Sequence, residues 1–209
     1  ILSNGVEFEC ASTQTILDAA KNNKIAIEHS CRSGRCGVCE TVVLSGETQV
    51  IQIEESLHRD AGKQTKILTC CRSPISDVYL DLEDLGEIGG IQVLTVPCRI
   101  HRLELLNDDV IQMILRLPPN TNFKFVAGQY VNLIHGGLRR SYSIANAPRE
   151  DGHLELQIKR VKHGLMSNYL FNQAKQNDLL RLEGPLGTFS YRESSAENLV
   201  LIATGTGIA

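Results

Sequence analysis

The sequence contains no long apolar run. No stretch reaches the roughly eighteen consecutive apolar residues that a membrane-spanning helix requires, so no membrane span is expected. No secretory signal peptide is recognisable, although the chain starts at Ile1 without a methionine, which leaves open a removed leader. Internal repeats and low-complexity segments are absent as well. With 42% hydrophobic and 22% charged residues, the composition is typical of a globular protein.

Seven cysteines are present, and their distribution is informative. An odd number that clusters in the chain argues against a secreted disulfide framework and favours a reducing cytoplasm. Cys31, Cys36 and Cys39 are spaced C-x4-C-x2-C, and a further cysteine lies downstream at Cys70 or Cys71. This spacing is typical of the plant-type ligand set for a 2Fe-2S cluster.

A zinc site is the main alternative for these cysteines. Structural zinc sites favour two C-x2-C pairs, and Cys36 and Cys39 form the only such pair here. Gly34 and Gly37 also fit a cluster loop, since glycine lets the backbone bend and approach closely. The two remaining cysteines, Cys10 and Cys98, lie in strand-like runs and are expected to be small buried apolar residues.

The first half of the chain has a mixed helix and strand pattern. A helix is expected over 12–23, capped by Ser12 or Thr13 and ended by two asparagines. A strand, a turn and a second strand are expected over 40–50, and a half-buried strand over 77–85. A charged, glycine-rich stretch then predicts a boundary near residue 90. The net charge is −6 over residues 1–90 and +3 over 91–209, which hints at two units with different partners.

The second half is rich in strands. Six runs separated by turn residues predict a small antiparallel barrel: "TVPCRIHRLEL", "VIQMILRL", "QYVNLI", "RSYSIA", "HLELQIKRV" and "LLRLEG". A helix starting at Ser167 interrupts them. The apolar run "LVLIATGTGIA" then predicts a buried parallel strand that leads into a glycine turn at Gly205 and Gly207, as at the opening of a nucleotide-binding domain.

Two stretches carry residue types that suit a flavin nucleotide. Arg140 suits a diphosphate, because its guanidinium is planar and permanently charged, and Tyr142 and Ser143 offer an aromatic ring and a hydrogen-bond donor. Further on, Gly164 and Ser167 open a helix whose free N–H groups attract phosphate. Taken alone, the first stretch is equally typical of a polar edge strand, and the second of a plain capped helix.

Residues 1–85 resemble plant-type ferredoxin domains. The matching motifs are "TILDAA", "SCRSGRCGVC", "LSGE" and "ILTCCRSPISDVYL". The resemblance implies an α+β, β-grasp-like fold. It also implies that the metal ligands are Cys31, Cys36, Cys39 and Cys70, and that Cys71 is not a ligand.

Residues 95–193 resemble the ferredoxin–NADP reductase superfamily through "FVAGQYVNL", "RRSYSIAN", "GLMSNYL" and "GPLGTF". The resemblance implies an antiparallel β-barrel that binds FAD. It places Arg140 on the phosphates, and Tyr142 and Ser143 at the reacting flavin ring. The full set of FAD-binding residues that it implies is Arg140, Tyr142, Ser143, Val161, Gly164, Met166 and Ser167. Gly205 and Gly207 match the glycine turn of an NAD(P) site.

The resemblance implies a layout of four parts. These are a 2Fe-2S domain (1–85), a linker (86–94), an FAD barrel (95–193) and the incomplete start of an α/β NAD(P)-binding domain (194–209). Electrons would pass from NAD(P)H through FAD to the cluster and on to a partner protein, with no nucleic acid involved. The motifs are most similar to the CDP-6-deoxy-delta-3,4-glucoseen reductases of deoxysugar synthesis, whose partner is a dehydratase.

Two alternatives stay open. One is the reductase component of a phenol or aromatic-ring oxygenase, and the other is a ferredoxin-like carrier without flavin activity. The choice between NADH and NADPH and the oligomeric state are not predicted.

Overall fold

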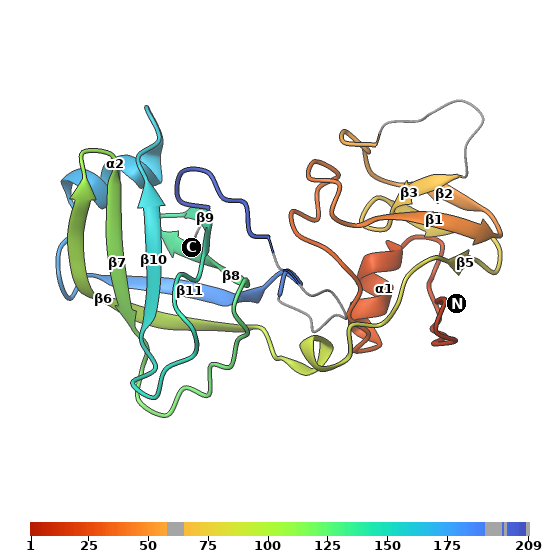
Figure 1. Ribbon diagram of the computed structural model, residues 1–209, viewed down its shortest axis with the longest axis horizontal. Coiled ribbons are helices and arrows are strands. Elements are labelled where there is room, and N and C mark those ends of the chain that lie inside the picture. The colour runs from red at the N-terminus through yellow and green to blue at the C-terminus, as the bar shows by residue number, and fades with distance from the viewer. Residues whose placement is uncertain (58–64, 191–197, 199, 208–209) are drawn as a thin grey trace. The chain divides into compact units, whose positions relative to one another are not determined.

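The computed structural model describes residues 1–57, 65–190, 198 and 200–207. The chain divides into two compact units, Ile1–Gly90 and Ile91–Ala209, and each is described by itself (Figure 1). Among the described helices, none has both the length and the apolar character needed to cross a membrane.

The first unit combines one α-helix with short antiparallel strands. Strands β3, β1 and β5 form one sheet in that order, and β2 pairs with β4 in a second sheet. The elements of this unit are α1 (Ile16–Asn22), β1 (Glu40–Ser45), β2 (Thr48–Val50), β3 (Lys66–Leu68), β4 (Arg72–Pro74), β5 (Tyr79–Leu80) and the 3-10 helix η1 (Gly86–Gly90).

Helix α1 closes one side of the first unit's core. Its N-cap is Thr15, whose hydroxyl accepts a hydrogen bond from the Asp18 N–H at 3.0 Å. The expected cap at Ser12 or Thr13 is therefore wrong: the helix begins directly at its apolar face, so the residue just before Ile16 caps it. That face packs on the buried side chains of Ile67 and Leu68 from β3.

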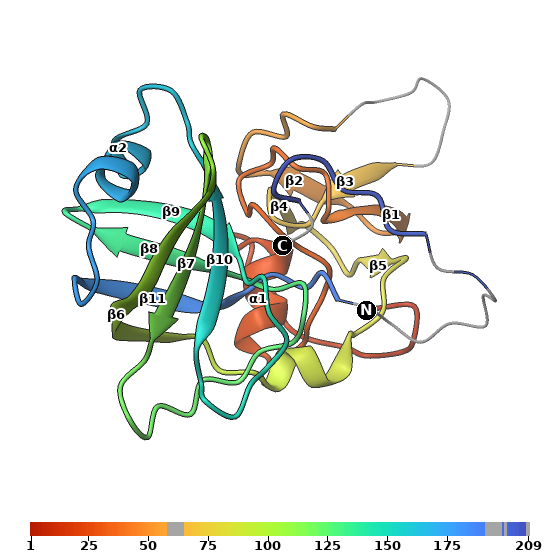
Figure 2. The ribbon, with the colours of Figure 1, turned by 60° about the vertical axis from the view of Figure 1, so that its left-hand side comes forward.

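The second unit is one curled antiparallel sheet, ordered β10-β7-β6-β11-β8-β9. All six predicted strands are present, as β6 (Leu94–Asn107), β7 (Val110–Arg116), β8 (Tyr130–His135), β9 (Leu138–Ser143), β10 (Leu154–Lys159) and β11 (Leu179–Leu186). The sheet forms a half-barrel around an apolar core that includes Cys98, which is 2% exposed. Figure 2 shows helix α2 (Leu165–Asn172) beside β9.

The stretch expected as a linker contains η1, and β6 begins at Leu94. Two other local expectations are wrong. Helix α2 begins at Leu165 with Gly164 as its N-cap, two residues before the expected start at Ser167. The apolar run near the C-terminal end forms no strand at residues 200–204, and Val200, Leu201 and Ile202 are 78–90% exposed. A strand requires neighbours to pair with, and the described residues offer none there. The rest of that run, Leu199 and residues 208–209, lies outside the described residues.

Candidate functional site

Four cysteines of the first unit come together as two pairs. Cys39 and Cys70 are both 3% exposed, and their Sγ atoms lie 3.3 Å apart. Cys31 and Cys36 are exposed on the loop before β1, and the Cys36 thiol hydrogen-bonds to Cys31. The structure thus brings Cys70 next to Cys39, 31 positions away in the sequence.

The thiols differ in acidity. At Cys31, burial raises the pKa, but hydrogen bonds from Ser33, Cys36 and the Arg35 backbone outweigh it and lower the pKa to about 6. At Cys39, the hydrogen bond with Cys70 and then burial raise the pKa well above its usual range. Cys31 is therefore disposed to ionise, whereas Cys39 favours the neutral thiol.

The loop between Cys31 and Cys39 depends on unusual backbone angles. Arg32, Gly34 and Gly37 all have positive φ, of 57°, 75° and 76°. At Gly34 a side chain is excluded for a second reason, because a Cβ atom would lie 2.1 Å from the Ile53 carbonyl oxygen. Only glycine fits there, since both the φ angle and the space rule out a Cβ.

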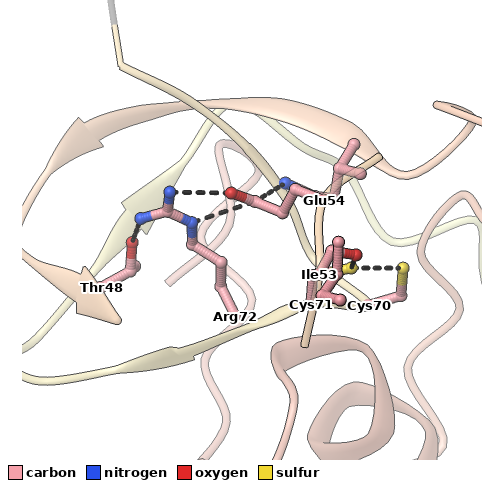
Figure 3. A network of polar contacts seen from close by, with 7 residues as sticks. Thr48, Ile53, Glu54, Cys70, Cys71 and Arg72 are labelled. Atoms are coloured by element: carbon pink, nitrogen blue, oxygen red, sulfur yellow. Dashed lines mark hydrogen bonds and ion pairs between the residues drawn. The ribbon is translucent and has the colours of Figure 1, made fainter. Parts of the chain in front are cut away.

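A buried ion pair fixes the segment that supports this loop (Figure 3). The Arg72 guanidinium donates two hydrogen bonds to the Glu54 carboxylate, at 3.0 and 2.9 Å, and one to the Thr48 hydroxyl at 3.2 Å. Glu54 also accepts from the Leu68 N–H at 3.0 Å. The side chains of Arg72 and Glu54 are 10% and 6% exposed. No sequence motif pointed to this pair, because an acidic stretch such as "IEES" usually lies on the surface.

The residues present fit a 2Fe-2S cluster. Within the described part of the chain, no group of three or more Cys, His, Asp or Glu side chains already surrounds a single ion position. Two thiol pairs suit a two-iron centre better than a single ion, because its four cysteines are shared between two irons. The Ser56 hydroxyl oxygen is buried without a hydrogen-bond partner among the described residues and lies 3.6 Å from where a Cβ of Gly37 would be. A cluster sulfur would give that donor an acceptor.

In the second unit, strand β9 carries the expected flavin residues. Arg140 is exposed and forms no ion pair with any described residue; its guanidinium donates a hydrogen bond to the Arg139 carbonyl at 2.7 Å. Arg139, in contrast, pairs with Glu183 at 3.1 Å. Of the two arginines, Arg140 is therefore the one whose charge stays available for an anion.

Tyr142 lies on the same face of β9 as Arg140, two residues along the strand. Its ring packs against the apolar core. Burial raises the pKa of the Tyr142 hydroxyl, and the nearby positive charge of Arg140 partly offsets the rise. Ser143 follows at the end of the strand and is exposed. A half-buried ring beside an unpaired guanidinium suits an aromatic ligand with a phosphate tail.

Helix α2 begins with N–H groups that precede its first intrahelical bond. Asn168 donates that bond to the Gly164 carbonyl at 2.7 Å, so the amides of residues 165–167 are available. Gly164 has an ordinary φ of −73°, and a Cβ there would be in tight contact with Val161, at 3.2 Å. Ser167 does not cap the helix: its hydroxyl accepts from the Val161 N–H at 2.8 Å. It sits one turn inside the helix, where its side chain points back toward the preceding loop.

The side chains expected near the phosphates have different exposures. Met166 is 2% exposed and belongs to the core, so only its backbone N–H can face a ligand. Val161 is 62% exposed. Gly205 has a φ of 59° and lies in a turn closed by a 3.0 Å hydrogen bond from the Gly207 N–H to the Thr204 carbonyl.

Helix α2 and strand β9 are in contact. The rings of His135, at the end of β8, and Tyr169, on α2, are stacked with their centroids 3.8 Å apart. The Tyr169 hydroxyl donates to Asp178 at 3.0 Å. This stack, which the sequence did not reveal, ties the helix to the strand pair that carries Arg140. A guanidinium and the free amides of a helix N-terminus are both donor types that fit the diphosphate of FAD.

Comparison with known domains agrees with both sites. Residues 1–75 match the 2Fe-2S iron-sulfur cluster binding domain, and residues 97–191 match the oxidoreductase FAD-binding domain. The chain thus carries an iron–sulfur cluster binding domain followed by an FAD-binding domain. Its fold class, a ferredoxin domain followed by an antiparallel FAD-binding domain, agrees with the one that the sequence predicts.

The chain is similar to reductases that are named for different partners. It is 43% identical over 206 residues to the CDP-6-deoxy-L-threo-D-glycero-4-hexulose-3-dehydrase reductase of Yersinia pestis, covering 99% of this chain and 62% of that relative. A structure of an Amycolatopsis cytochrome P450 reductase matches with a TM-score of 0.65 and 28% identity, over 92% of this chain and 58% of that one. A ferredoxin reductase in carbazole 1,9a-dioxygenase matches with a TM-score of 0.60 and 29% identity, over 99% and 66%.

Proposed function

We propose that this protein carries electrons from NAD(P)H through FAD to a 2Fe-2S cluster and on to a partner protein. The observation that carries the proposal is the presence of both sites in one chain: paired cysteines in the first unit, and Arg140 beside the α2 amides in the second. A flavin accepts a hydride and releases single electrons, which is the chemistry needed between NAD(P)H and an iron–sulfur centre.

The residues have separate tasks in this proposal. Cys31, Cys36, Cys39 and Cys70 hold the cluster, and Ser56 donates a hydrogen bond toward it. Arg140 and the first amides of α2 bind the diphosphate, while Tyr142 and Ser143 face the flavin ring. We further propose the division into 1–85, 86–94, 95–193 and 194–209, in which Gly205 and Gly207 begin an NAD(P) site. Clustered free thiols favour a cytoplasmic location.

We propose a sugar-nucleotide dehydrase as the electron acceptor. The Yersinia pestis reductase supports this choice by its higher identity, although the chain spans only 62% of its length. The test is NADH or NADPH oxidation by the protein carrying both cofactors, with a CDP-6-deoxy-4-hexulose-3-dehydrase and its sugar nucleotide present. The proposal predicts sugar-dependent consumption of the nicotinamide. Turnover with an aromatic-ring oxygenase component and none with the dehydrase would favour the oxygenase alternative.

A further inference from the structure

Cys71, the neighbour of the expected ligand Cys70, has no place in the ligand set, yet it is fully buried at 0% exposure. Its Sγ lies 3.5 Å from the Cys70 Sγ and 3.4 Å from the Ile53 carbonyl oxygen (Figure 3). A thiol has one hydrogen and donates it weakly. That hydrogen therefore has two acceptors within reach, one of which is the sulfur of the adjacent cysteine.

The surroundings of Cys71 keep its side chain in this position. Its N–H donates to the Leu68 carbonyl at 2.8 Å, and its own carbonyl accepts from the N–H groups of Ile51 and Gln52 at 2.9 and 3.1 Å. The Cys71 Sγ would lie only 2.9 Å from a Cβ at Gly34, so the loop packs tightly against it. Close packing on this side leaves the thiol facing the same two acceptors.

We propose that Cys71 is a positioning residue for electron transfer, whose thiol hydrogen is shared between the Ile53 carbonyl and the Cys70 sulfur. The proposal rests on the assignment of Cys70 as a ligand. As a ligand Cys70 is a thiolate and can only accept, so Cys71 is the donor of the pair. Hydrogen bonds to ligand sulfurs set the reduction potential of iron–sulfur centres.

The physical effect follows from charge. One added electron makes the ligand sulfur more negative, while the Ile53 carbonyl keeps the same partial charge. The Cys71 thiol then interacts more strongly with Cys70 in the reduced state than in the oxidised state, which favours reduction. No bond is broken and no proton leaves Cys71. Without this donor, the reduced state loses more stabilisation than the oxidised state.

The test is the midpoint potential of the cluster in the cluster-loaded protein, compared between wild type, Cys71→Ala and Cys71→Ser. We expect Cys71→Ala to keep its iron and to shift the one-electron equilibrium about three- to tenfold toward the oxidised state. Since a tenfold change corresponds to 59 mV for one electron, the potential should fall by up to about 59 mV. Cys71→Ser retains a donor, so its potential should lie between the other two. The g-values of the reduced paramagnetic signal should also move in Cys71→Ala.

Two controls separate this effect from the loss of any cysteine. Cys10→Ala removes a half-buried thiol of the same unit and Cys98→Ala a buried one of the other unit; both should leave the potential unchanged. If cluster-loaded Cys71→Ala has the same midpoint potential as the wild type, the proposal is overturned. If Cys71→Ala does not fold, Cys71→Ser decides. This variant must load the cluster, and its one-electron equilibrium must lie within about threefold of the wild-type equilibrium. Loss of the cluster from Cys71→Ser with retention in Cys70→Ser would instead make Cys71 the ligand, and would refute the ligand assignment itself.

Discussion

The Sγ atoms of Cys39 and Cys70 lie 3.3 Å apart, although 31 positions separate the two residues in the chain. The backbone brings them together, since the Thr69 N–H donates to the Cys39 carbonyl at 3.1 Å. The turn between β3 and β4 thus delivers a buried thiol to the end of the cysteine loop.

The first prediction is that Cys70→Ser loses the cluster and Cys71→Ser keeps it. Cys70 is the thiol in contact with Cys39, whereas the Cys71 thiol donates to the Ile53 carbonyl. Iron and acid-labile sulfide content, with the paramagnetic resonance of the reduced protein, distinguishes the two variants. Zinc in place of iron in the purified protein would contradict the cluster itself.

The second prediction concerns the two glycines of the loop. Gly34→Ala should prevent normal cluster loading for two reasons. The added Cβ would lie 2.1 Å from the Ile53 carbonyl oxygen, and the positive φ at this position is strained for alanine. Gly37→Ala is the matched control: its φ is also positive, but its nearest neighbour is 3.6 Å away. It should cost only about 1 kcal/mol in unfolding free energy. Equal cluster content in the two variants would show that the close contact at Gly34 is unimportant.

The third prediction concerns the buried ion pair. Glu54→Ala leaves the Arg72 guanidinium buried without a counter-charge, and should destabilise the first unit by about 3–5 kcal/mol. Glu55→Ala is the control, since its pair with Arg35 is 51–70% exposed and such pairs contribute less than about 1 kcal/mol. Urea unfolding followed by the cluster's visible absorbance measures both. Similar midpoints would mean that Glu54 does not hold the loop segment.

The fourth prediction separates neighbouring arginines. Arg140→Ala should weaken FAD binding about ten- to a hundredfold, because it removes a charge-assisted hydrogen bond worth roughly 1.5–3 kcal/mol. Arg140→Lys should recover part of the affinity, since an ammonium lacks the planar fork. Arg139→Ala should have a smaller effect, because Arg139 is already paired with Glu183. Isothermal titration of the FAD-free protein with FAD tests this order, and a larger effect at Arg139 would reverse the assignment.

Much of the fold could be predicted from local patterns. The six strands of the second unit could be predicted because strand-like runs are separated by turn residues; along β7 burial alternates, with Ile111, Met113 and Leu115 facing the core. The C-terminal apolar run also predicts a strand, but an apolar run becomes a strand only where a neighbour pairs with it. Residues 200–204 have no such neighbour among the described strands.

The candidate sites were predicted less completely. The cysteine spacing points to a cluster because its ligands are close together in sequence. The contacts that hold the loop, such as Glu54 with Arg72, join residues 18 positions apart, and no local pattern encodes them. Likewise, serine is a residue type that often caps helices. The Ser167 hydroxyl instead accepts a hydrogen bond from the Val161 N–H, because the helix starts two residues earlier.

The central claim is that flavin and cluster exchange electrons within one chain. The most direct measurement is laser-flash reduction of the flavin under anaerobic conditions, in protein carrying both cofactors, with flavin and cluster absorbance followed at separate wavelengths. The account predicts that the flavin signal decays and the cluster bleaches with one rate constant, independent of protein concentration, and that Cys70→Ser abolishes this phase. A reduced flavin that persists beside an oxidised cluster, or a rate that rises in proportion to protein concentration, would contradict it.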